Sequence, residues 1–162
     1  MSEQPVVRLA TASDVETIHK LLRHLADSTG LRQKFTSRTE DFLRFGFCDE
    51  PKFEVLLAEQ DEVVVGLCLF FYNFSSWRGE LGVYIQDLVV DSDVRASGIG
   101  RLLVRETARL AAGQGAAHLR LSVDRDNHKA MRFYEKIGLR ESVDEKIFAA
   151  YDGDFVNLVE AG

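Results

Sequence analysis

The sequence of 162 residues holds little of what marks several protein classes: it has two cysteines, two prolines and one tryptophan. Cys48 and Cys68 allow at most one disulfide and form no closely spaced metal-binding pair, which argues against a disulfide scaffold and favours a reducing compartment. Few prolines, with 46% hydrophobic and 28% charged residues, are typical of a globular chain. The length suits a single domain, which we expect to span residues 1–162.

An excess of basic residues is also lacking. The 20 Lys and Arg against 26 Asp and Glu give a net charge of −6, which disfavours nucleic acid and anionic membranes as partners. The longest apolar run, residues 63–72, is interrupted by Gly66 and is shorter than the roughly 20 residues of a membrane helix. No basic stretch followed by an apolar segment opens the sequence, so we expect no secretory signal and a cytoplasmic location.

The spacing of apolar residues predicts alternating strands and helices. After a first strand, Thr11 or Ser13 is expected to cap a helix. A second, short helix is expected to begin at Thr39 and to end near Gly46. The predicted strands are residues 6–9, 53–58, 63–74, 81–90, 118–123, 139–143 and 146–151, and the later helices are residues 99–112 and 128–137.

The predicted order is β-α-α-β-β-β-α-β-α-β-β. This order is typical of an α/β (α+β) protein with one mixed sheet. The strands at 81–90 and 118–123 are joined by the helix at 99–112, so we expect them to be parallel. A ligand is then expected at their carboxyl ends, where the crossover helix begins.

That position carries a glycine-containing motif, residues 95–101, with the sequence Arg-Ala-Ser-Gly-Ile-Gly-Arg. Two glycines allow a bulky anion to approach the backbone, and the amides of a first helical turn attract a pyrophosphate. A dinucleotide-binding motif would need a glycine in place of Leu103, and a P-loop would need Gly-Lys-Ser/Thr. The alternative is a plain glycine-rich turn next to an arginine.

The motif resembles the [Arg/Gln]-x-x-Gly-x-[Gly/Ala] signature of the GNAT superfamily of acetyl-CoA-dependent N-acetyltransferases. Residues 70–79 and 84–90 resemble, more narrowly, the spermidine/spermine (diamine) acetyltransferase branch, and residues 8–12 and 127–138 extend the likeness. The resemblance implies the GNAT fold, acetyl-CoA as co-substrate without a metal, and a homodimer.

The resemblance also implies a set of coenzyme contacts. Backbone groups of three strand residues would pair with the pantetheine arm, the motif would bind the pyrophosphate, and two residues of the next helix would make a second contact. These residues are Leu88, Val89, Val90, Arg95, Ala96, Ser97, Gly98, Ile99, Gly100, Arg101, Asn127 and Ala130.

Three residues are candidates for proton transfer. Tyr134 matches the tyrosine that the family places near the sulfur, and it lies seven residues, about two helical turns, after Asn127 on the same face. An amine of pKa ~10 must lose a proton before it attacks a thioester. The diamine branch carries a glutamate where this chain has Gln86, an amide that cannot be a base. The proton is then left to a water chain or to Asp87, which alternation turns away from Gln86 unless a bulge re-aims it.

The acceptor is expected to be a primary amine on a small molecule, either diamine-like, polyamine-like or lysine-like, attacking directly in a ternary complex. Gln86, Thr29 and Trp77 are the candidate substrate-binding residues, although Trp77 fits a dimer surface equally well. Thr29 and Lys146 stand where the diamine branch has acidic residues, which disfavours spermidine. An aminoglycoside or protein amino group, and a non-catalytic acetyl-CoA sensor, are the alternatives.

Overall fold

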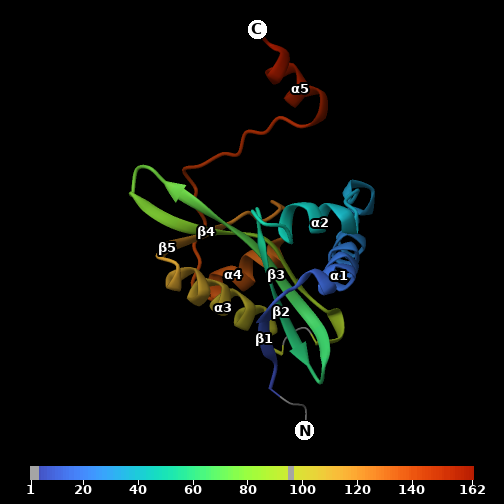
Figure 1. The fold of residues 1–162 in the computed structure, drawn as a ribbon. Coiled ribbons are helices and arrows are strands. Elements are labelled where there is room, and N and C mark those ends of the chain that lie inside the picture. The colour runs from blue at the N-terminus through green and yellow to red at the C-terminus, as the bar shows by residue number, and fades with distance from the viewer. Residues whose placement is uncertain (1–3, 95–96) are drawn as a thin grey trace. The chain divides into compact units, whose positions relative to one another are not determined.

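The computed structural model describes residues 4–94 and 97–162, and its course is shown in Figure 1. The chain divides into two compact units, Met1–Ser122 and Val123–Gly162. The prediction of one domain over residues 1–162 stays a prediction.

The first unit is built on a five-stranded sheet in the order β1-β2-β3-β4-β5. The strands are β1 Val6–Leu9, β2 Glu54–Gln60, β3 Val63–Ser75, β4 Glu80–Val90 and β5 Ala116–Leu121. Neighbouring strands are antiparallel up to β4, and β4 pairs with β5 in parallel, as predicted. The mixed α/β fold class is therefore confirmed.

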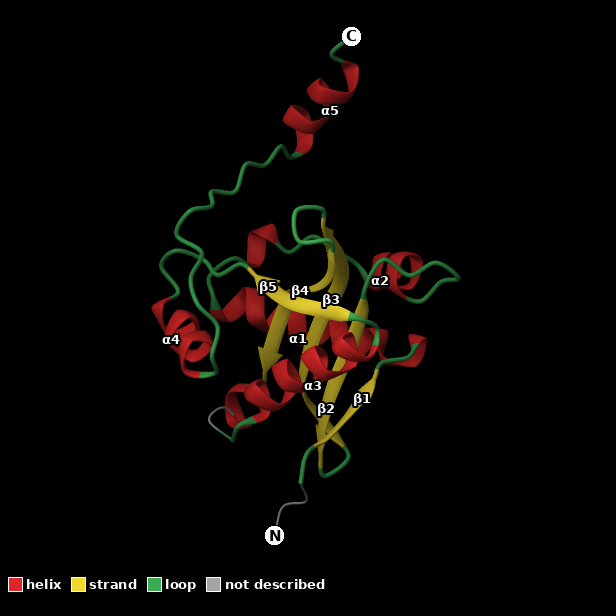
Figure 2. Cartoon of the chain, turned by 90° about the vertical axis from the view of Figure 1, so that its left-hand side faces the viewer, coloured by secondary structure: helices red, strands yellow, loops and turns green. Residues whose placement is uncertain are grey.

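Helices cover both faces of this sheet (Figure 2). Helices α1, Val15–Ser28, and α2, Thr39–Gly46, pack on one face, and α3, Ile99–Gly113, follows β4 and packs on the other. The two faces are distinguished by β3, where Leu67 belongs to the core under α1 while its neighbour Gly66 faces α3. The buried core under α1 and α2 consists of Val15, Ile18, Leu21, Leu22, Phe42, Val55, Leu57, Leu67, Leu69 and Val89.

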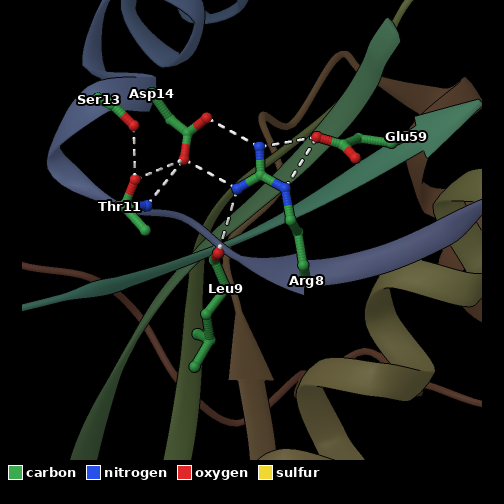
Figure 3. Close-up of polar contacts among 6 residues, drawn as sticks. All are labelled: Arg8, Leu9, Thr11, Ser13, Asp14 and Glu59. Atoms are coloured by element: carbon green, nitrogen blue, oxygen red, sulfur yellow. Dashed lines mark hydrogen bonds and ion pairs between the residues drawn. The ribbon is translucent and has the colours of Figure 1, made fainter. Parts of the chain in front are cut away.

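Short 3₁₀ turns connect several of these elements: η1 Ala12–Asp14, η2 Arg32–Lys34 and η3 Ser92–Val94. The first of them is tied to the sheet edge by an ion-pair network (Figure 3). Arg8 donates from Nη1 and Nη2 to both carboxylate oxygens of Asp14 at 2.9 Å, and from Nε to Oε1 of Glu59 at 2.8 Å. These hydrogen bonds lower the pKa of Asp14 to about 2. The network therefore holds β1, β2 and the entrance to α1 together.

The second unit contains helices α4, His128–Lys136, and α5, Asp152–Glu160. The strands predicted at 139–143 and 146–151 are wrong, because no residue of either range lies in a ladder in the structure. Four of their large side chains, Val143, Ile147, Phe148 and Tyr151, are exposed, with Phe148 at 93%. Apolar, β-prone residues form a strand only when a second strand pairs with them, and no strand of the described chain pairs with residues 139–151.

Neither a membrane-crossing helix nor a metal-binding cluster occurs among the described residues. No helix within 4–94 or 97–162 is long and apolar enough to cross a membrane. Over the same ranges, no group of three or more histidine, cysteine, aspartate or glutamate side chains is arranged to hold a metal ion.

Candidate active site

A β-bulge interrupts strand β4 where its partner on one side ends. Leu69 of β3 pairs with Asp87, but the next pair is Phe70 with Ile85, so Gln86 is an extra residue on β4. The parallel pairing with β5 ends at the same level, with Ile85 opposite Leu121. The last part of β4, from Gln86 onward, therefore runs beyond the end of β5.

The bulge decides where Asp87 points. Asp87 lies opposite Leu69, and Tyr84 lies opposite Phe71, so these four residues share the face of the sheet that α1 and α2 cover. Gln86 itself is exposed. Without the bulge, alternation would place Asp87 on the same face as Ile85. The bulge therefore turns Asp87 to the opposite face, which is the possibility that the sequence left open.

The carboxylate of Asp87 is partly buried and, within the described chain, makes no hydrogen bond or ion pair. Burial raises its pKa above the ordinary value for aspartate, since the charged form is poorly solvated there. A carboxylate with no partner and a raised pKa is a better proton acceptor near neutral pH than a free aspartate.

Aromatic side chains continue this face of the sheet. The rings of Phe71 and Tyr84 are stacked with centroids 5.1 Å apart, and the Tyr84 hydroxyl lies 2.6 Å from Oγ of Ser122, just past the end of β5. Sequence reasoning missed Phe71 and Ser122, because only strand register brings residues from three strands together. The run of aromatic residues 70–72 was the available signal, but it gave no pairing.

The first turn of α3 lies directly after this region in the sequence. Gly98 is the N-cap, with φ 87° in the left-handed region that suits glycine, and it offers no side-chain cap to the helix. The first intrahelical bond runs from the Leu102 amide to the Gly98 carbonyl at 3.0 Å. The amides of Ile99, Gly100 and Arg101 therefore have no intrahelical partner, and an anion can bind there.

Five other predicted coenzyme contacts do not belong to this first helical turn. Arg95 and Ala96 lie outside the described residues, and Ser97 donates its hydroxyl to the Val94 carbonyl. Asn127 and Ala130 belong to the second unit, where the Asn127 side-chain oxygen accepts a hydrogen bond from the Ala130 amide at 3.1 Å and caps α4.

Tyr134 lies on the same helix, half-buried, with its ring 5.1 Å from that of Phe133. Because it is part of the second unit, its role beside the elements of the first unit stays a prediction.

The sequence matches the model of the acetyltransferase (GNAT) family over residues 18–139. The chain belongs to this family. It is therefore an acyltransferase, and the expected resemblance is confirmed.

Relatives of this GNAT chain differ in the acceptor that their names state. A thialysine N-epsilon-acetyltransferase of Bos taurus is 30% identical over 144 residues, which are 84% of each chain. A spermidine/spermine N(1)-acetyltransferase-like protein of Homo sapiens is 28% identical over 112 residues, which are 65% of this chain and 16% of that protein. A solved aminoglycoside acetyltransferase from an uncultured soil sample superposes with a TM-score of 0.75, covering 91% of this chain and 97% of its own, at 17% identity, which supports the fold alone.

Within the GNAT fold of this chain, two predicted acceptor-binding residues have other surroundings. Thr29 donates its hydroxyl to the Leu25 carbonyl at 2.9 Å and closes the end of α1. Trp77 lies in the turn between β3 and β4, where it is 99% exposed. Neither has a hydrogen bond or ring contact with Gln86 among the described residues, so their part in binding an acceptor stays a prediction.

The buried cysteine of this GNAT chain, Cys68, offers no nucleophile for a covalent intermediate. Cys68 is fully buried in β3, and burial raises its pKa to about 12, so the thiol stays protonated at neutral pH. Cys48 lies exposed in the loop that follows α2.

Proposed function

We propose that this GNAT enzyme transfers the acetyl group of acetyl-CoA to the primary amine of a lysine-like small molecule, by direct attack in a ternary complex. The single observation that carries the proposal is Asp87, a partly buried carboxylate that has no partner among the described residues and that, with the bulge, lies on the same face of the sheet as Tyr84. It supplies the proton acceptor that Gln86, as an amide, cannot supply.

Two features of the first unit fit acetyl-CoA, which the family uses as co-substrate. The backbone of Leu88 and Val89 lies past the last pair with β5, where an extended pantetheine arm would add to the sheet edge. The uncapped amides of Ile99, Gly100 and Arg101 suit the pyrophosphate, with the exposed Arg101 side chain adding positive charge.

The proposed reaction balances without a covalent enzyme intermediate. The protonated amine gives one proton to Asp87, directly or through a water molecule, and its nitrogen then bonds to the thioester carbonyl carbon. The Leu88 amide is proposed to donate to the carbonyl oxygen as negative charge develops. The carbon–sulfur bond breaks, and the departing thiolate, whose ordinary thiol pKa of ~8.5 makes it a fair leaving group, takes a proton from the Tyr134 hydroxyl. The nitrogen then gives up its second proton, which returns through solvent to the tyrosinate, so the one proton left on Asp87 is the proton that the reaction releases.

The choice of a lysine-like acceptor has two supports. The bovine relative is named for acetylating the ε-amine of thialysine and matches most of the chain. The side chains at positions that would hold a polyamine are Thr29, Gln86 and Lys146, none of them acidic, so a multiply charged chain has little to bind. A homodimer, which the resemblance implies, is part of the same proposal and is tested by light scattering.

The deciding experiment follows thiol release from acetyl-CoA with lysine analogues, diamines, polyamines, aminoglycosides and a lysine-containing peptide. We expect the highest kcat/KM with a lysine analogue. A higher kcat/KM with polyamines or with the peptide would contradict the proposed acceptor. Tight acetyl-CoA binding with no turnover on any amine would contradict catalysis and support a sensor.

A further inference from the structure

Gly66 is a buried glycine in β3, paired with Ala58 on one side and Val90 on the other. A Cβ atom at this position would lie 2.8 Å from the Val89 carbonyl oxygen, 3.2 Å from Cδ1 of Leu103 and 3.3 Å from Cγ2 of Ile99. Carbon and carbonyl oxygen ordinarily approach to about 3.3 Å, and two carbons to about 3.5 Å. No side chain fits at position 66 without movement of its neighbours.

The three atoms that limit this space belong to the two elements of the proposed coenzyme site. Val89 lies in the part of β4 that runs beyond β5, and Ile99 and Leu103 are in the first two turns of α3. The chain leaving β4 is also tied to β3 here, because the Asp91 amide donates to the Val65 carbonyl at 2.8 Å. The backbone of β3 is therefore the shared support of both elements.

We propose that Gly66 is a positioning residue for acetyl-CoA: the missing side chain sets how closely the first turn of α3 approaches the end of β4. This inference rests on the proposed function, since it assigns pantetheine to one element and pyrophosphate to the other. Both parts belong to one ligand of fixed length, so a change in the spacing weakens contacts at one end or the other.

The consequence of a side chain at position 66 follows from which neighbour yields. The tightest contact, 2.8 Å to the Val89 carbonyl oxygen, is with backbone of the β3–β4 ladder, so relieving it shifts the end of β4 relative to β3. The contacts with the Ile99 and Leu103 side chains, at 3.3 and 3.2 Å, press α3 away from β3 at the same time. The end of β4 and the first turn of α3 are therefore displaced relative to each other.

A matched glycine separates positioning from simple packing. Gly82 is also buried in the same sheet, at the far end of β4 from Val89, and the three atoms nearest to a Cβ there would all belong to the His118 ring. An alanine at position 82 therefore disturbs packing at the end of β4 that is distant from the proposed coenzyme site.

The test compares Gly66→Ala with Gly82→Ala in the full chain. Acetyl-CoA affinity is measured by calorimetry, and KM for the amine and thermal unfolding are measured beside it. We expect acetyl-CoA binding to weaken about tenfold in Gly66→Ala, with the amine KM within twofold. We expect Gly82→Ala to lower the melting temperature with acetyl-CoA affinity within twofold of wild type. Equal affinity losses in the two variants, or wild-type affinity in a folded Gly66→Ala, would overturn the inference.

A second variant decides the matter if Gly66→Ala does not fold. Ile99→Ala removes the side chain that seats the first turn of α3 against Gly66, while alanine favours the helix. We expect it to weaken acetyl-CoA binding about tenfold, and wild-type affinity in the folded variant would refute positioning through this contact. If the wild-type chain does not bind acetyl-CoA, the proposed function itself is refuted. If the wild-type chain turns over and the variants bind acetyl-CoA as tightly as it does, only the role of Gly66 is refuted.

Discussion

Replacing Arg8 by methionine removes the charge at the centre of the network that joins β1, β2 and η1 while keeping much of the apolar stem. The Arg8 side chain is 37% exposed, and those of Asp14 and Glu59 are 13% and 27% exposed. The two bonds to Asp14 are a bidentate arginine–carboxylate pair, the geometry in which an ion pair stabilises most.

The lowered pKa of Asp14 sets the size of the effect. A fall from 3.8 to about 2 corresponds, at about 1.4 kcal/mol per pKa unit, to a little over 2 kcal/mol as an upper value. Arg8 is more than a third exposed, so water screens part of this interaction and we expect Arg8→Met to lower the free energy of unfolding by about 1–2 kcal/mol at pH 7. For a chain of this size, the melting temperature should fall by about 2–8 °C.

The pH dependence follows from the direction of the shift. The folded-state pKa of Asp14 is lowered, so the stabilisation is present above the unfolded value near 4 and is lost as pH falls through about 2. The difference in unfolding free energy between wild type and Arg8→Met should therefore shrink between pH 4 and pH 2.

The assay is urea unfolding followed by circular dichroism at several pH values, with Arg32→Met as the matched control. Arg32 pairs with Asp27 at 3.3 Å, but the two side chains are 52% and 48% exposed, so its loss should cost less than about 0.5 kcal/mol. Equal effects of the two substitutions, or a difference for Arg8→Met that does not change from pH 7 to pH 2, would refute the reasoning.

Four further predictions concern the proposed site. Asp87→Asn should lower kcat about 100-fold with acetyl-CoA affinity unchanged. Because burial raises the pKa of Asp87, the acidic limb of the wild-type rate profile should lie at a higher pH than an ordinary aspartate would give, and an identical profile in the variant would exclude Asp87 as the base. Gly98→Val forces a branched side chain into left-handed backbone at φ 87° and should weaken acetyl-CoA binding, measured by calorimetry, at least tenfold. Tyr134→Phe should lower kcat without changing acetyl-CoA affinity, and an unaltered kcat would remove it as the acid. Gln86→Glu should raise kcat/KM for diamines relative to lysine analogues. No gain on any diamine would count against the hypothesis that Gln86 stands in place of a glutamate base.

Much of the first unit could be predicted because its signals are local. The spacing of Val15, Ile18 and Leu22 marks one face of α1, and these residues are buried in the core. The parallel pairing of β4 with β5 follows from the helical crossover between them. The glycines of residues 95–101 predicted the start of a helix and an anion site, and α3 begins at Ile99 after Gly98 in left-handed backbone.

The errors arise where the outcome depends on partners far away in the sequence. Residues 139–151 have the composition of strands but no ladder partner in the described chain, so their β propensity is not realised. The surroundings of Thr29 were also not visible in the sequence: its hydroxyl donates to two carbonyls at the end of α1, and its part in binding an acceptor stays a prediction. In both cases the local sequence does not show which groups are available as hydrogen-bond partners in the folded chain.

The sequence by itself determined the family, the order of the main elements and the loop that suits a pyrophosphate, because a short motif and local periodicity carry that information. Only the tertiary structure decided the direction of Asp87, since one extra residue in β4 relative to β3 reverses which face a side chain occupies. Only the tertiary structure, likewise, shows that Val89, Ile99 and Leu103 leave no space for a side chain at position 66. A bulge and a close approach are properties of paired strands and packed helices, and neither is written in the local pattern of one strand.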